Sequence, residues 1–441
     1  MTRLASTLVR RARTSTALWI PIIWLFIAGS RPVSLWLHLQ VIGNAADAQL
    51  EGSPVDRNIF TFLVVAAIAV LIARRRKLMT LLVANWPLLL FLVYCGFSIF
   101  WSDFPDVAFK RWIRAVGDVS MVLVVLTDPL PGAAVEQFLS RVGYFILPLS
   151  ILSDLGRGAY GREYRFGLTT NKNMFGAISM VLGLTALWRF LVILRSAHRK
   201  GGRRRARMQL LLFGVLIGMA LVCIWGANSA TSAACFLLGT LVLIATHRWS
   251  LFRRPTVLHV MVVSVVFLAI YATIINPNFG IVSTLGKDPT LTGRTDVWQA
   301  VIRLNPSRWV GAGFESFWLG DRLKEMWSIF VWQPNEAHDG YIEMYLNLGW
   351  IGLALFGLVM IVGYSRIVRG VRDDRDFGSL RLAFFVVAVV YNLTEAGFRI
   401  FNPVYIVFLL SLMMPRRLYH EKITPRPAVV ASSVDSPVVL A

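Results

Sequence analysis

Residues 208–246 read MQLLLFGVLIGMALVCIWGANSATSAACFLLGTLVLIAT and contain no charged side chain. Two apolar runs, 208–225 and 231–246, are separated by a few small and polar residues. Each run approaches the roughly 20 residues that a helix needs to cross a bilayer. In lipid, backbone N–H and C=O groups must be hydrogen-bonded within their own element, so such runs are helices. This stretch therefore predicts two successive membrane-spanning helices.

The rest of the chain has the same character. Of its 441 residues, 56% are hydrophobic and only 16% are charged, whereas a soluble domain carries roughly 25% charged residues. We therefore expect an all-α polytopic membrane protein. About twelve spans are predicted, at residues 17–37, 58–73, 78–100, 112–127, 136–152, 174–194, 208–225, 231–246, 256–275, 341–365, 380–397 and 401–414.

Basic residues are grouped in short clusters beside these apolar runs. The positive-inside rule places such clusters in the cytoplasm, which orients the chain with both termini cytoplasmic in a bacterial inner membrane. The net charge of +21 does not indicate a nucleic-acid-binding protein, because no basic stripe lies on a soluble domain. The cytoplasmic clusters are Arg74–Lys77, Arg195–Arg207, Arg248 with Arg253 and Arg254, Arg366–Arg381, and Arg416 with Arg417.

This orientation divides the chain into four parts. Residues 1–275 form an N-terminal membrane bundle of about nine spans, and residues 276–337 form a large periplasmic loop. Residues 338–415 contain about three further spans, and residues 416–441 form a cytoplasmic tail that we expect to be disordered. Within the loop, apolar residues between Thr295 and Leu304 recur at helical spacing, which predicts a short amphipathic helix on the outer membrane surface.

The sequence contains no recognisable motif for binding a cofactor or a metal. Cys95, Cys223 and Cys235 lie in or beside apolar runs, without the spacing of a disulfide framework or a metal site. Phosphate-binding glycine loops are not found either. We therefore expect no cofactor and no metal.

Charged and amide side chains gather instead at the outer ends of the spans. Basic residues there run against the positive-inside rule, so they have either a structural or a functional reason. They could extend toward lipid phosphates, or they could bind an anionic ligand at headgroup depth, such as a polyprenyl pyrophosphate. The residues are Lys110, Arg111, Arg114, Arg162, Arg165, Asn171, Lys172, Asn173, Arg294, Glu336, His338, Asp339, Glu395 and Arg399.

His338 opens a predicted span in the segment EAHDGYIEMYLNLGWIG, residues 336–352. The partial positive charge of a helix N-terminus attracts a pyrophosphate and disfavours a protonated imidazole. His338 is therefore expected to be neutral and able to act as a base. The alternative is a polar residue that only caps the helix.

Several segments, in order along the chain, resemble the superfamily of Wzy-type polymerases and O-antigen ligases. The residues concerned are Trp101, Ser102 and Pro105; Arg165, Gly167, Asn171 and Asn173; Gly293, Arg294 and Trp298; the Gly-x-Gly turn in VGAGFESF (310–317); and His338 with Gly349. The segments LWIPIIWLFIAGSRPVSLWL (18–37) and NKNMFG (171–176) are similar to exopolysaccharide polymerases of the ExoQ kind. One departure is Ala230, because relatives often carry a basic residue between the positions of Ser229 and Thr231.

The resemblance implies metal-independent glycosyl transfer from an undecaprenyl-pyrophosphate-linked oligosaccharide. On this interpretation Arg294 and Arg165 neutralise the leaving pyrophosphate, and His338 removes the proton of the acceptor hydroxyl. Glu395 or Asp339 could orient His338, and Tyr345 and Glu343 could help to line the sugar groove. The remaining substrate-binding candidates are Arg162, Arg114, Asn171, Asn173 and Tyr341. Partners would be the membrane lipid and proteins for chain-length control and export.

Three other functions stay open. A ligase would use the same donor and pass the glycan to lipid A-core or to a protein. A transporter of lipid-linked sugars would need ionisable groups at mid-depth and paired halves, and neither is visible. A non-catalytic partner in an export complex would tolerate the loss of Arg294 and His338.

Overall fold

Helices make up the regular structure of the described part of the chain. The computed structural model describes residues 14–39, 52–156, 158, 163–197, 203–275 and 292–415, and no strand occurs among them. Seven of the described helices are long and apolar enough to cross a membrane, which confirms an all-α polytopic membrane protein. They are α4 (Pro54–Ala73), α8 (Pro131–Gly156), α9 (Lys172–Ala197), α10 (Arg203–Ala227), α11 (Ala230–Arg248), α16 (Gly340–Asp373), and α12 (Pro255–Ile270), whose span continues to Thr273.

The predicted span 78–100 is wrong as a single straight helix. It consists of α5 (Arg75–Ala84) and α6 (Trp86–Phe97), which meet at an angle of 87°. The break lies at Asn85, whose backbone is not helical. Pro87, the second residue of α6, can donate no hydrogen bond to the preceding turn. Counted as one span, this bent pair brings the total among the described residues to eight at most.

The other predicted spans hold helices that do not combine the length and the apolar composition of a membrane span. Two of them, α1 (Trp19–Ala28) and α18 (Pro403–Met413), are apolar but have only 10 and 11 residues. The number of spans, about twelve by sequence, therefore stays a prediction. The remaining helices are α7 (Pro105–Leu126), α17 (Arg375–Tyr391), α2 (Val33–Trp36), α14 (Thr292–Arg303), α15 (Gly320–Ile329), η1 (Thr16–Leu18), η2 (Ser98–Trp101), η3 (Ser250–Arg253) and the π-helical turn η4 (Tyr271–Ile275).

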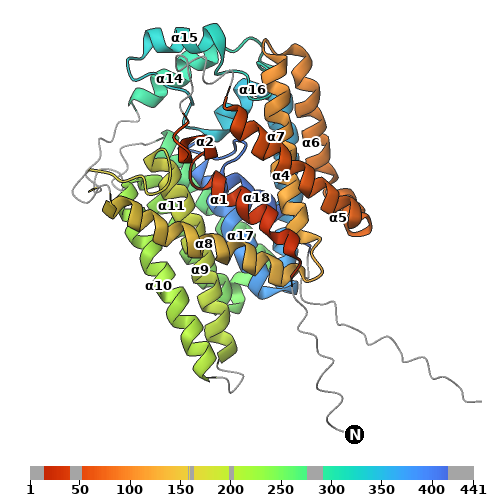
Figure 1. The fold of residues 1–441 in the computed structure, drawn as a ribbon, viewed down its shortest axis with the longest axis vertical. Coiled ribbons are helices and arrows are strands. Elements are labelled where there is room, and N and C mark those ends of the chain that lie inside the picture. Colours follow the sequence, from red (N-terminus) through yellow and green to blue (C-terminus); the bar gives the residue numbers. More distant parts are fainter. Residues whose placement is uncertain are drawn as a thin grey trace, which may run out of the picture.

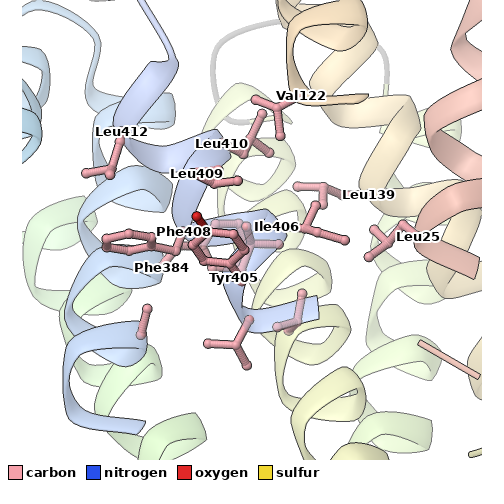
Figure 2. Close-up of a cluster of buried hydrophobic side chains, with 14 of the residues drawn as sticks. Leu25, Val122, Leu139, Phe384, Tyr405, Ile406, Phe408, Leu409, Leu410 and Leu412 are labelled. Carbon is pink, nitrogen blue, oxygen red and sulfur yellow. The ribbon is translucent and has the colours of Figure 1, made fainter. Parts of the chain in front are cut away.

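Helix α18 lies at the centre of the apolar core. All of its residues are buried, as expected for a helix that is hydrophobic on every face. Figure 2 shows its side chains among residues of four other helices. These neighbours are Leu25 of α1, Val122 of α7, Leu139 of α8 and Phe384 of α17.

Helices α14 and α15 lie together at one end of the bundle, at the top of Figure 1. We call residues 292–337 the cap. Val297 and Val301 of α14 pack with Phe317, Leu323 and Met326 in a small core of their own. The helix predicted near 295–304 is confirmed. Its apolar face is buried inside the protein, and its place on the outer membrane surface stays a prediction.

Glycine at position 349 joins the cap to α16. Here the helix is interrupted, with φ 64° and ψ −166°, and the cap's 308–309 backbone enters the break. Trp350 N donates to Arg308 O at 2.9 Å, and Ile351 N donates to Trp309 O at 3.1 Å. A Cβ on Gly349 would lie 2.2 Å from the Trp309 backbone. Only glycine therefore permits this approach.

The other side of the cap is held by η2. Trp101 Nε1 donates to Val310 O at 3.2 Å, and Ser102 Oγ donates to Ser316 Oγ at 2.8 Å. Phe314 N donates to Ser98 Oγ at 2.9 Å. The Trp-Ser segment of the sequence, Trp101 and Ser102, thus has a structural role, because it binds the glycine-containing loop 310–316 of the cap.

Replacing Gly349 with alanine should destabilise the protein. The added methyl group would clash with the Trp309 backbone, and alanine would have to adopt the positive φ of this position. We therefore expect the free energy of unfolding to fall by about 2 kcal/mol or more. Gly357→Ala in the same helix is the matched control, because nothing lies within 4 Å of a Cβ there. Thermal midpoints of the purified proteins in detergent measure the difference. Equal midpoints for the two variants would contradict this account of the break.

Candidate functional site

His338 stands directly before helix α16 but does not cap it. Asp339 is the capping residue, since its Oδ1 accepts from Tyr341 N and Ile342 N, each at 2.8 Å. The alternative interpretation of His338 as a cap is therefore wrong. The His338 backbone is left-handed, with φ 52°, a conformation that histidine adopts more readily than most residues. Its ring is thus available for contacts with side chains.

Two carboxylates surround the imidazole of His338. Its Nδ1 lies 3.0 Å from Glu336 Oε1 and 3.4 Å from Glu395 Oε2. Burial disfavours the charged ring, but the two carboxylates outweigh burial and raise the pKa of His338 to about 9. Burial likewise acts to raise the pKa of Glu336, yet His338 and Arg399 bring it below its usual value.

The expectation that the helix N-terminus keeps His338 neutral is therefore wrong. The partial charge at a helix end is about half an elementary charge, whereas two full negative charges lie within hydrogen-bonding range. No described residue hydrogen-bonds to Nε2 of His338, so Nε2 is the nitrogen that can meet a substrate.

Glu395 connects three of the residues singled out in the sequence. It lies between α17 and α18, and its side chain is 6% exposed. Asn173 Nδ2 donates to its Oε2 at 3.0 Å, and Arg294 Nη2 lies 3.3 Å from its Oε1. His338 is the third partner. Arg294 also donates to the carbonyl of Thr394. Asn173, Arg294 and His338 thus converge on one carboxylate from distant segments of the chain.

A second ion-pair group adjoins this one. Arg399 lies 3.4 Å from Glu336 Oε2 and 3.5 Å from Glu315 Oε2, while Arg111 donates to the Glu315 carbonyl. Burial opposes the charge of Arg399, but its acidic neighbours raise the pKa above the usual value. Positive and negative groups therefore alternate, with Glu315, Glu336 and Glu395 beside Arg399, His338 and Arg294.

The sequence showed no metal motif, but the fold assembles three potential ligands. Atoms of Glu336, His338 and Glu395 lie within 4.8 Å of one another. Each carboxylate also has an arginine partner, Arg399 for Glu336 and Arg294 for Glu395. A cation among them would be repelled by two guanidinium groups. The geometry therefore favours an ion-pair cluster, and independence of metals stays a prediction.

The other predicted binding residues have contacts elsewhere. Asn171 Oδ1 accepts from Met174 N at 2.8 Å at the start of α9. Arg165 is buried against α10, where its guanidinium lies 5.3 Å from the centre of the Trp225 ring. Arg114 lies 5.1 Å from the centre of the Phe60 ring, and Tyr341 Oη donates to Val389 O at 3.0 Å. Arg162 is outside the described residues, as is the tail 416–441.

Glu343 and Tyr345, also considered for the sugar groove, have structural contacts. Glu343 is buried and accepts from Trp318 Nε1 at 2.8 Å and Ala337 N at 2.6 Å. Tyr345 packs against Trp350, with ring centres 5.2 Å apart. Glu343 therefore helps to hold the cap on α16, and Tyr345 also packs against the small core of the cap.

The position of Ala230 adjoins the cluster. Its neighbour Thr231 hydrogen-bonds through Oγ1 to Thr394 Oγ1 at 2.8 Å, and Thr394 in turn accepts from Arg294. The start of α11 is thus linked to Arg294 through Thr231 and Thr394. Sequence reasoning missed Thr231, Thr394 and Glu315. Of these only Glu315 carried a signal, as the one charged residue of VGAGFESF.

Comparisons with known proteins agree with the resemblance. Residues 213–357 match the family described as O-Antigen ligase. The chain is 25% identical over 356 residues to the "Exopolysaccharide production protein ExoQ" of Rhizobium meliloti (strain 1021), covering 74% of this chain and 77% of that protein. These matches confirm the similarity to the Wzy polymerase and O-antigen ligase superfamily, of the ExoQ kind. The matched family segment includes Arg294 and His338 but ends before Glu395.

The raised pKa of His338 predicts a pH-dependent contribution to stability. The contribution is complete below the ordinary pKa of 6.5 and is lost as pH rises through about 9. The thermal midpoint of wild type should therefore exceed that of His338→Asn most at pH 6 and converge with it toward pH 10. His38→Asn is the control, because His38 shares the left-handed backbone. A difference that grows with pH would contradict the ion-pair assignment.

Proposed function

We propose that this protein polymerises undecaprenyl-pyrophosphate-linked oligosaccharide repeat units into an exopolysaccharide at the periplasmic face of the inner membrane. The observation that carries the proposal is the convergence of Arg294 and His338 on Glu395. A guanidinium and an imidazole lie beside the same carboxylate, and these groups suit phosphate binding and proton transfer. Similarity to a protein named for exopolysaccharide production supports the same assignment.

The reaction needs two kinds of help. A hydroxyl oxygen of the acceptor sugar forms a bond to the anomeric carbon of the donor, while the bond from that carbon to the pyrophosphate oxygen breaks. The leaving pyrophosphate gains negative charge, which Arg294 stabilises through its two-pronged guanidinium. The ring of His338 first loses its resting proton to solvent, and the hydroxyl proton then passes to Nε2 of the neutral ring.

Glu395 serves both groups in this proposal. In the structure it holds Arg294 and Nδ1 of His338 at the same time. A pyrophosphate carries more negative charge than one carboxylate, so it can draw Arg294 toward itself. Arg294 is within reach, since its side chain is 28% exposed. Glu395 then remains as partner of the imidazolium that forms when His338 takes the proton.

The surrounding residues complete the proposed donor and acceptor site. Asn173 touches Glu395 directly and lies closest to the reacting groups. Arg165, Arg162, Arg114, Asn171 and Tyr341 remain proposed contacts for the pyrophosphate or the glycan. The cap would lie in the periplasm and both termini in the cytoplasm, in line with the positive-inside rule. Chain-length regulators and export proteins would act on the product.

A ligase is the second candidate, favoured by the family description O-Antigen ligase for residues 213–357. It would use the same donor, the same Arg294 and the same His338. The acceptor alone distinguishes the two functions. Polymer formed from lipid-linked repeat units as sole substrate supports the polymerase, whereas transfer only to lipid A-core or protein supports the ligase.

Arg294→Ala should abolish transfer in vesicles that contain the purified protein and lipid-linked repeat units. Arg294→Lys should recover only part of the rate, because an ammonium group cannot grip two phosphate oxygens at once. Arg303→Ala on the same helix is the control, since Arg303 is exposed. Gel separation of labelled polymer measures the rate. Full activity of Arg294→Ala would place the donor site elsewhere.

His338→Asn should make no polymer, with or without a chelator, and should leave lipid-linked repeat units unused. Asparagine tolerates the left-handed backbone but cannot take the proton. Because His338 is protonated at rest, the wild-type rate should rise with pH and level off near 9, the pKa of the ring. A rate that is constant at lower pH and falls above 9 would instead assign His338 a role as a cation. Loss of activity with the chelator would establish a metal requirement.

A further inference from the structure

A pocket lined by basic residues lies at the corner between α4 and α5. It is open, has a volume of about 450 Å³, and is lined by residues 73–77 together with Thr127 and Pro129. Four consecutive lining residues are basic, from Arg74 to Lys77. The volume is sufficient for a small ligand or a lipid headgroup.

The pocket has an excess of positive charge. Arg74 Nη2 lies 3.8 Å from Asp128 Oδ2, and Arg74 Nη1 also donates to Val124 O at 3.0 Å. Asp128, between the lining residues Thr127 and Pro129, is the acidic partner of Arg74. Arg75 and Arg76 are exposed, and no side-chain partner is found for them within the described ranges. The pocket thus suits an anion.

The pocket and the candidate site lie at opposite ends of α7. This helix begins at Pro105, directly after Phe104, which packs close to Gly320 of the cap. It ends at Leu126, next to the pocket residue Thr127. Its 22 residues span roughly 33 Å at 1.5 Å per residue, about the thickness of the hydrocarbon core of a bilayer. The pocket therefore lies about one hydrocarbon-core thickness from the cap, the separation expected of a site at the opposite headgroup layer.

Helix α5 leaves the bundle at this level. The 87° bend turns it away from α6, and it lies apart from α14 and α15, at the right of Figure 1. Met79 and Val83, one helical turn apart, are 58% and 70% exposed, and Trp86 after the bend is 52% exposed. Apolar residues on one face beside basic residues are typical of a helix that lies in the membrane interface.

We propose that this pocket binds the phosphate headgroup of an anionic phospholipid, while Met79 and Val83 contact its acyl chains. The positive charge of the pocket suits a phosphate group. Its distance from the cap and the adjoining apolar face of α5 favour a lipid over a soluble anion. The site is separate from the proposed glycosyl-transfer site and does not depend on that function. Sequence topology places the same residues on the cytoplasmic side, where anionic headgroups attract basic clusters.

Native mass spectrometry of the full-length protein in neutral detergent tests the proposal. The protein should retain phosphatidylglycerol in preference to phosphatidylcholine with the same acyl chains. Arg75→Gln combined with Arg76→Gln should weaken retention roughly 30-fold, from about 1 kcal/mol per basic residue. The matched control is Arg204→Gln with Arg205→Gln, an exposed pair at the start of α10. Unchanged retention in the first pair, or equal loss in both pairs, would overturn the proposal.

Two further measurements separate a lipid from a free anion. Inorganic phosphate at millimolar concentration should not displace phosphatidylglycerol. Displacement would mean that the pocket binds the phosphate group without any contribution from the acyl chains. Met79→Ser combined with Val83→Ser keeps every charge and should still weaken lipid retention, because the acyl contact is lost. Unchanged retention in this pair would overturn the assignment of the apolar face. Thermal midpoints in detergent that match wild type confirm that the variants are folded.

Discussion

The buried carboxylate of Glu395 is the interaction on which the site depends. A buried charge is costly unless it is paired, and Glu395 is paired with Arg294, His338 and Asn173 at once. These partners come from the cap, the segment before α16 and the start of α9, while Glu395 itself lies between α17 and α18. The same contacts therefore neutralise the charge and fix the relative positions of four segments. Loss of the carboxylate would leave a guanidinium and an imidazolium close together without compensation.

The cap owes its position to close backbone contacts. Its loop enters the break of α16 at Gly349, and its glycine turn is bound by Trp101 and Ser102 on the other side. Arg294 on α14 and His338 before α16 therefore belong to one rigid assembly. A flexible loop could not hold both groups at the distances that acid–base and phosphate chemistry require.

The electrostatics of the cluster set the resting state of His338. Two carboxylates within hydrogen-bonding range outweigh both burial and the partial charge of a helix end, and they raise the pKa of the ring to about 9. In the proposed reaction, a protonated His338 suits the arrival of an anionic donor. Glu395 is the partner of Arg294 until the proposed pyrophosphate replaces it. The alternation of charges further explains why three potential metal ligands can gather beside two arginines.

The sequence by itself determined the membrane class and the approximate positions of the helices, and it singled out charged and amide residues at the ends of the apolar runs. These depend on local properties, since long apolar runs in lipid can only be helices, and charged residues at their ends stand out. Arg294, His338, Asn173 and Glu395 were all visible in this way. The tertiary structure alone decided that they meet, that Asp339 rather than His338 caps α16, that α5 and α6 bend apart, and that α14 buries its apolar face in the cap. Each of these outcomes depends on contacts between segments far apart in the chain, and hydrophobic periodicity along one segment carries no information about such contacts.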